Sequence, residues 1–96
     1  MRRIPFNDET KALAARLIWF EPAEEALADP IRFMAYAFAR ATHEEMNLLR
    51  GYLDEADFAE ALANAPAGII DPRSWAYWNA RIGRYPTPPM PSRRFG

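Results

Sequence analysis

Apolar residues recur every three or four positions through most of this chain, the spacing of one buried face on an α-helix. The first stretch with this spacing predicts a helix over residues 9–20. The dipeptide Glu21-Pro22 should end that helix, because the residue before a proline avoids the α region. Residues 22–28 fit one short further turn of helix. The side chains expected to point inward from the first helix are Leu13, Leu17 and Phe20.

Helix-starting signals divide the rest of the chain. Asp29-Pro30 and Asp71-Pro72 each place a capping carboxylate before a proline at the first helical position, where the missing N–H costs nothing. Thr42 and Glu45 have the spacing of a capping box, and Asp54 can cap another helix. We therefore predict helices over residues 30–41, from 42 to about 52, from 54 to a break at 64–68, and over 71–83. The side chains expected to point inward from the helices that begin at 42 and 54 are Met46, Leu49, Leu53, Phe58, Ala61 and Leu62, and those expected to point outward are Asp57 and Glu60. One stripe of the helix over 30–41 consists of Ile31, Met34, Ala35 and Phe38, and one face of the last helix consists of Trp75, Trp78, Asn79 and Ile82.

No strand pattern competes with these helices. Alternating runs of β-branched residues are missing, and the chain contains no valine. We predict an all-α fold, a small bundle of about five short helices with a proline-rich extended C-terminal tail. Residues 1–84 form a single helical domain in this prediction, and residues 85–96 form the proline-rich, basic tail. A chain of 96 residues can bury only one modest core.

Charge is spread unevenly along the chain, although the net charge is only −1. Residues 21–60 carry ten acidic residues against three arginines, whereas residues 61–96 carry five arginines against Asp71 alone. This asymmetry is typical of a molecule with an acidic face and a basic end that meet different neighbours. Acidic residues that stabilise helix N-termini account for the same pattern without any partner.

The residue inventory offers no catalytic, cofactor or metal site. His43 is the only histidine, and Asn47 stands where a zinc-binding H-E-x-x-H motif needs its second histidine. The chain has no cysteine, and its four glycines are too far apart to form a phosphate-binding loop. We therefore expect a solvent-facing His43, no metal, no cofactor and no enzyme activity.

The sequence favours a cytoplasmic protein. Polar residues interrupt the stretch after Arg2 and Arg3, so no signal peptide is expected. No apolar run approaches the roughly 20 residues that a membrane-spanning helix needs. The absence of cysteine agrees with a reducing compartment.

Residues 71–96 are the strongest candidate for a binding site. They hold two of the three tryptophans, two tyrosines and five arginines. Large aromatic residues and arginine dominate binding hot spots, and a proline-fixed tail loses little entropy when it docks. We predict that this region binds a partner protein, although the spacing of Trp75 and Trp78 fits core residues as well. The residues assigned to partner binding are Trp75, Tyr77, Trp78, Tyr85 and Met90.

Nucleic-acid binding is the alternative. Arginines favour phosphate contacts, and three successive helices over residues 42–83 resemble a helix-turn-helix array. The last helix would then make the contacts, through Arg73, Asn79, Arg81 and Arg84. The acidic residues of the two preceding helices weigh against this interpretation. A structural homodimer is a third interpretation.

Four segments of the chain resemble, in the same order, motifs of a family of short bacterial helical proteins. The segments are residues 16–21 (RLIWFE), 42–52 (THEEMNLLRGY), 58–65 (FAEALANA) and 70–78 (IDPRSWAYW). Members of this family are often encoded beside nucleotidyltransferase-like toxins of the AbiEii kind. The resemblance implies an antitoxin-like protein that neutralises such a toxin, and it assigns no binding residues.

Overall fold

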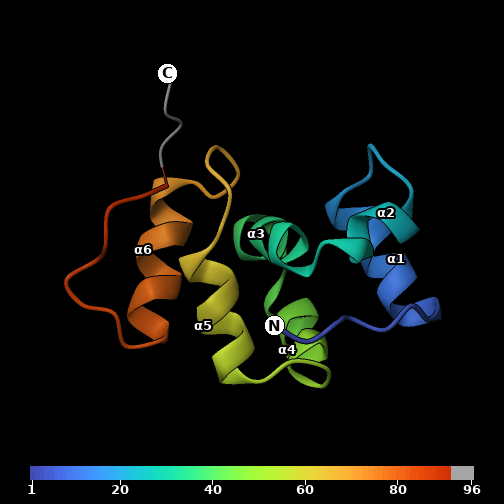
Figure 1. Cartoon of the computed structure of the whole chain (residues 1–96), viewed down its shortest axis with the longest axis horizontal. Coiled ribbons are helices and arrows are strands. Elements are labelled where there is room, and N and C mark those ends of the chain that lie inside the picture. Colours follow the sequence, from blue (N-terminus) through green and yellow to red (C-terminus); the bar gives the residue numbers. More distant parts are fainter. Residues whose placement is uncertain (92–96) are drawn as a thin grey trace.

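The computed structural model describes residues 1–91 of the chain, and within them it contains six α-helices and no strand (Figure 1). The helices are α1 (Asp8–Leu17), α2 (Ala23–Ala28), α3 (Pro30–Arg40), α4 (His43–Arg50), α5 (Glu55–Ala63) and α6 (Pro72–Arg81). The predicted all-α fold is confirmed, and the short turn expected at residues 22–28 is the separate helix α2. Each helix in residues 1–91 is too short or too polar to cross a bilayer.

Side-chain caps begin every helix except α2. Asn7, Thr42 and Asp54 form capping boxes at the starts of α1, α4 and α5. Asp29 and Asp71 each accept a hydrogen bond from the backbone N–H three residues further on. A cap of this kind is worth about 1 kcal/mol, because it satisfies N–H groups that the helix itself leaves without a partner.

Helix α3 lies at the centre of the bundle and contacts α1, α2, α5 and α6 (Figure 1). Phe33 and Met34 in its first two turns are fully buried. Near its end, Phe38 meets Phe58 of α5 and Trp78 of α6, with ring centroids 5.9 and 5.2 Å away. These three residues form an aromatic cluster in the edge-on and tilted geometries that aromatic rings prefer. The aromatic cluster fixes α5 and α6 on the central helix.

Two inward or outward assignments from the sequence are wrong. Helix α1 ends at Leu17, because Ile18 leaves the α region with φ −127° and ψ 66°. Phe20 therefore lies beyond the helix and is 47% exposed, where the sequence predicted a buried residue. Asp57, predicted to face solvent, is buried, because the N-terminal end of the chain covers it.

Residues 1–6 form an extended strap, the N-terminal strap, that runs from α5 to the start of α1 (Figure 1). The Arg2 guanidinium lies 2.7 Å from carboxylate oxygens of both Asp54 and Asp57. Ile4 is buried in the core. The hydroxyl of Thr10 donates to the carbonyl oxygen of Pro5 at 2.6 Å, which joins the strap to α1.

The buried carboxylate of Asp57 makes the stability dependent on pH. Burial opposes its ionisation, but the backbone N–H groups of Asp54 and Arg2 and the Arg2 guanidinium outweigh burial and hold the pKa of Asp57 below its ordinary value. A folded-state pKa below the unfolded value of about 3.9 stabilises the fold above that pH. This contribution is lost as the pH falls through the folded pKa.

We therefore expect Asp57→Asn to be less stable than the wild type by about 1–3 kcal/mol at pH 7, because it removes hydrogen bonds to a charged group. At an acid pH below the folded-state pKa the difference should shrink, because the wild-type carboxyl then becomes protonated. Urea unfolding at both pH values measures this, with the exposed Asp8 changed to Asn as the control. Equal losses at both pH values would contradict the expectation.

Candidate functional site

Helix α6 stands at one end of the molecule, and the chain after it runs back along its outer side (Figure 1). The side chain and backbone N–H of Ser74 hydrogen-bond to Asp71 and lower the pKa of this capping carboxyl, which keeps its charge at the positive end of the helix dipole. After α6, Gly83 takes a φ of +85°, a left-handed conformation that suits glycine. Residues 84–91, the docked tail, then return toward the first turn of α6.

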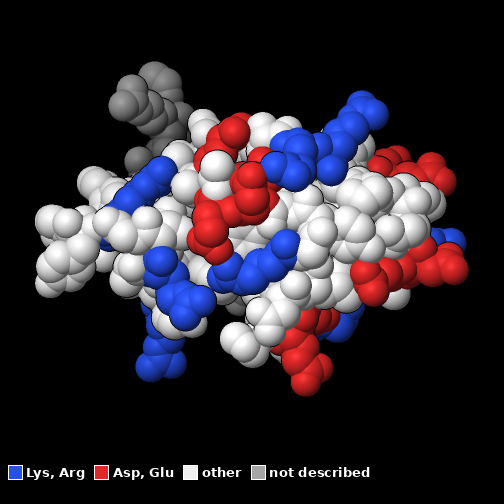
Figure 2. Space-filling view, turned by 90° about the horizontal axis from the view of Figure 1, so that it is seen from below, with Lys and Arg blue, Asp and Glu red and all other residues white. Residues whose placement is uncertain are grey.

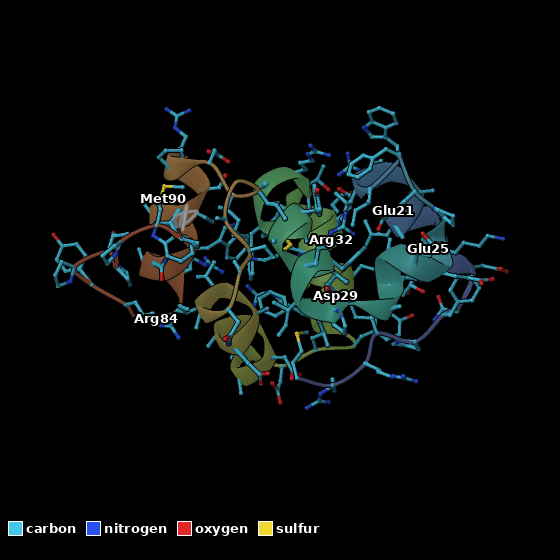
Figure 3. All side chains as sticks on the ribbon, turned by 45° about the horizontal axis from the view of Figure 1, so that its top comes forward. Glu21, Glu25, Asp29, Arg32, Arg84 and Met90 are labelled. Atoms are coloured by element: carbon cyan, nitrogen blue, oxygen red, sulfur yellow. The ribbon has the colours of Figure 1, made fainter. Side chains whose placement is uncertain are left out.

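Hydrogen bonds hold the docked tail at its start. The backbone N–H of Arg84 donates to the carbonyl oxygen of Asn79 at 2.8 Å. The Arg84 guanidinium donates to the carbonyl oxygen of Ala59 in α5 at 3.4 Å. Arg84 thus ties the beginning of the tail to two helices (Figure 3).

A second attachment lies beside the first turn of α6. The indole N–H of Trp75 donates to the carbonyl oxygen of Pro88 at 2.8 Å. Met90 follows, near the start of α6 in Figure 3, and packs against the core. Met90 therefore packs on the domain, whereas Tyr85 points into solvent.

The aromatic residues assigned to partner binding fall into two groups. Trp75 is only 5% exposed, and the half-buried Trp78 donates its indole N–H to the carbonyl oxygen of Phe38 at 3.1 Å. These two tryptophans hold the tail and α6 in place. Tyr77 is 53% exposed and Tyr85 is 87% exposed, so they provide the accessible aromatic surface. Tyr77 follows Trp75 by two residues, which is about 200° around the helix, so the two side chains lie on different sides of α6.

A cavity of about 250 Å³ opens beside Tyr77, between α6 and the facing ends of α3 and α4. Ser74, Tyr77 and Trp78 line it from α6, and His43 lines it from the first turn of α4. His43 is exposed, as predicted. The volume lies below the roughly 300–1,000 Å³ of small-molecule pockets. The cavity therefore suits a single side chain of a partner better than a cofactor.

The four residues assigned to nucleic-acid contact differ in accessibility. Arg73 and Arg81 are exposed on α6, whereas Arg84 is half-buried and bonded to α5. Asn79 is fully buried, and its amide N–H donates to the carbonyl oxygen of Trp75 at 2.8 Å. Its side chain therefore cannot reach a base. Figure 2 shows several basic side chains at the α6 end of one face, and mixed charges over the rest of that face.

The acidic stretch of the sequence is largely neutralised by cations. Six of the ten acidic residues between positions 21 and 60 form ion pairs, three of them with cations of the N-terminal strap. The six are Glu21, Glu45, Asp54, Glu55, Asp57 and Glu60. The pair between Arg2 and Asp54, in which both side chains are exposed, is of a kind that contributes about 0–1 kcal/mol. An interface of this protein would therefore rest on aromatic side chains more than on an acidic face.

Sequence reasoning missed a second group of exposed aromatic side chains, at the connection between α1 and α2. Trp19 is 74% exposed, and its ring meets that of Phe20 edge to face at 5.6 Å. Phe20 in turn contacts Tyr36 of α3 at 5.7 Å, and two arginine guanidiniums lie over the Tyr36 ring. Glu21 pairs with Arg32 beside them (Figure 3). The helix-ending signal Glu21-Pro22 could have placed these aromatics outside the helix.

No family model, curated protein or solved structure matches this chain. Within residues 1–91, no three His, Asp or Glu side chains are grouped to hold a metal ion. A function can therefore be inferred only from the surface that α6 and the docked tail form.

Proposed function

We propose that this protein is a protein–protein interaction module whose partner docks on α6 and the docked tail. The observation that carries the proposal is Tyr85, a large aromatic side chain that is 87% exposed on a backbone attached on both sides. A side chain displayed on an ordered segment binds with a smaller loss of conformational entropy than one on a free chain. Tyrosine is also among the residues that dominate binding hot spots.

The surroundings of α6 supply further parts of an interface. Tyr77 adds a second accessible ring, and the adjoining cavity can receive a partner side chain. Arg73 and Arg81 can meet acidic groups at the rim, where charge steers association more than it adds affinity. The partner surface that fits is mainly apolar, with acidic groups at its edge.

The family resemblance adds a specific partner class to this proposal. We propose a nucleotidyltransferase-like toxin as the partner, with this protein as its antitoxin-like neutralising subunit. Co-expression tests this finer proposal separately: the module should restore growth of cells that make the toxin, and Tyr85→Ala should restore it less well. Failure to restore growth would remove the toxin from the proposal and leave the interaction surface to be tested with whichever protein co-purifies.

Tyr85→Ala is expected to weaken partner binding about 30-fold, which corresponds to a hot-spot loss of about 2 kcal/mol. The free energy of unfolding of this variant should differ from that of the wild type by less than about 0.5 kcal/mol, because the side chain is exposed. Affinity purification of the tagged protein with mass spectrometry identifies the partner, and calorimetric titration with that partner measures the loss.

Trp19→Ala is the matched control, because it also removes a large exposed aromatic ring but from the connection between α1 and α2. That connection lies at the opposite end of the bundle from α6 (Figure 1). It should leave the affinity unchanged. Loss of binding in Trp19→Ala with normal binding in Tyr85→Ala would overturn the proposal and move the interface to the α1–α2 connection. Recovery of nucleic acid that is released as salt rises, with no protein partner, would support the nucleic-acid alternative instead.

A further inference from the structure

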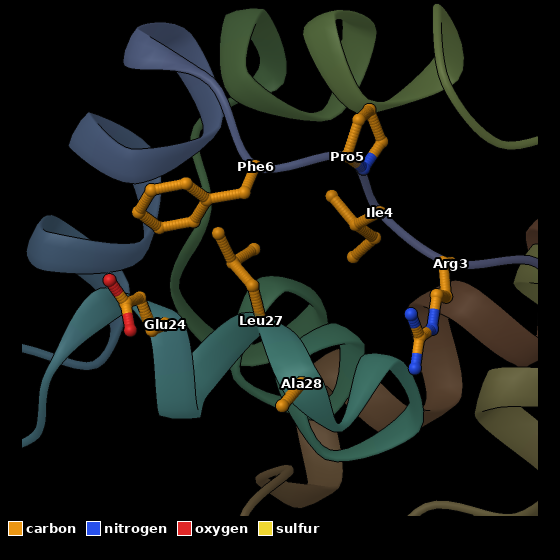
Figure 4. A pocket seen from close by; sticks show the side chains of 7 residues that line it. All are labelled: Arg3, Ile4, Pro5, Phe6, Glu24, Leu27 and Ala28. Atoms are coloured by element: carbon orange, nitrogen blue, oxygen red, sulfur yellow. The ribbon is translucent and has the colours of Figure 1, made fainter.

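An apolar groove of about 520 Å³ lies at the end of the molecule away from α6, between the N-terminal strap and α2 (Figure 4). Ile4 of the strap and Leu27 of α2 form its middle, and each is only 5% exposed. Phe6 lines the groove as well but is 51% exposed. The groove thus combines a fixed apolar floor with one aromatic side chain that is free to cover something else.

The two ends of the groove carry opposite charges. Figure 4 shows Glu24 near Phe6 at one end and Arg3 at the other. Within residues 1–91, neither Glu24 nor Arg3 takes part in an ion pair, whereas the neighbouring Arg2 is paired with two aspartates at the start of α5. An unneutralised anion and an unneutralised cation therefore flank an apolar strip. A second copy of the same strip, turned end for end, therefore presents a cation to the anion and an anion to the cation.

We propose that this groove is the two-fold interface of a homodimer and that its occupant is the same groove of a second copy. A two-fold axis through the middle of the groove turns the second copy end for end, so that Arg3 of each copy faces Glu24 of the other. Both ion pairs then form at once, and each Phe6 covers apolar surface of the other copy. The parallel alignment is disfavoured, because it would bring like charges together.

The size of the groove sets the strength of the dimer. The groove is lined by 7 residues, fewer than the roughly 20–30 on each side of a standard interface, so the dimer should be weak and dependent on concentration. The pairing leaves α6 of each copy at an outer end. A dimer would then display the proposed partner surface twice, which favours partners that are themselves paired or multivalent. The dimer itself does not depend on that proposed function.

Sedimentation velocity of the full chain at low salt, from about 1 μM to about 1 mM, tests the proposal. The wild type should pass from monomer to dimer across this range. Arg3→Glu and Glu24→Arg should each weaken the dimer at least tenfold, because like charges then face each other across both ends of the groove. An equimolar mixture of the two variants should restore it, because the mixed dimer regains two ion pairs, one of the original polarity and one with its signs exchanged. A variant that carries both Arg3→Glu and Glu24→Arg should form a dimer with itself, because both ion pairs are then present with their signs exchanged.

Glu25→Arg is the matched control, because Glu25 is the exposed neighbour of Glu24 and does not line the groove. It makes the same charge change and should leave the dimer intact. A wild type that stays monomeric to about 1 mM would overturn the proposal. A dimer that survives both single variants, or a loss that mixing does not recover, would overturn it too. Phe6→Ala tests the apolar contact without a charge change. It should weaken the dimer of the wild type, of the mixture and of the double variant alike.

Discussion

Phe58→Ala is expected to lower the free energy of unfolding by about 3–5 kcal/mol, the typical cost of truncating a buried phenylalanine. Phe58 is only 1% exposed, and its ring centroid lies 5.9 Å from that of Phe38 and 6.5 Å from that of Trp78. Truncation would leave a cavity in the aromatic cluster that holds α6. A native domain is stable by about 5–15 kcal/mol in total, so this one change would remove a large share.

Urea unfolding followed by circular dichroism measures the effect as a lower midpoint at an unchanged slope. Phe6→Ala is the control, because it deletes the same ring from a position that is 51% exposed. It should cost less than about 1 kcal/mol when measured on dilute monomer. Equal losses in the two variants would show that the aromatic cluster is not the main support of the bundle.

Ile4→Ala is expected to lower the free energy of unfolding by about 2–5 kcal/mol. Ile4 lies in the N-terminal strap, which has no regular structure, but its side chain is 5% exposed and belongs to the same core as the helices. The strap therefore contributes to the stability of the bundle as a helix would. It also forms one wall of the apolar groove, so its attachment decides whether the groove exists.

Arg3→Ala is the control for Ile4→Ala, because Arg3 is the adjacent residue, is exposed, and forms no ion pair within residues 1–91. Its effect should stay within about 0.5 kcal/mol. Both variants are compared by urea unfolding of the dilute protein at pH 7. A small loss in Ile4→Ala would mean that the strap detaches from the core at little cost.

The parts of the fold that were predictable depend on short-range interactions. Asp29, Thr42, Asp54 and Asp71 cap helices where the sequence placed them, because a cap involves residues only three positions apart. The N-terminal strap was not predictable, because a single Ile4 carries no period and its contacts are distant in sequence. The burial of Asp57 went unseen for the same reason, since it depends on Arg2 crossing α5.

The candidate site was located by composition, but its accessible residues were not. Residues 71–96 are rich in aromatics and arginine, and this composition predicts a binding site on α6 and the tail. Which rings are free depends on the path of the tail, which the hydrogen bond from Trp75 to Pro88 fixes across 13 residues. A helical period places Trp75 and Tyr77 on different sides but does not say which side is covered. Phe20 was misplaced because the apolar period continues past the point where α1 ends.

The three tryptophans lie in three different environments, and this gives the protein internal optical reporters. Trp19 is largely exposed, Trp75 lies beneath the docked tail, and Trp78 belongs to the aromatic cluster. Indole fluorescence moves to shorter wavelength as water withdraws from the ring, so the emission of the folded protein is a sum of distinct spectra. With Trp19 and Trp78 replaced by phenylalanine, the remaining emission comes from the one indole bonded to Pro88. Its colour then reports whether the tail is attached to the helix, without any added dye.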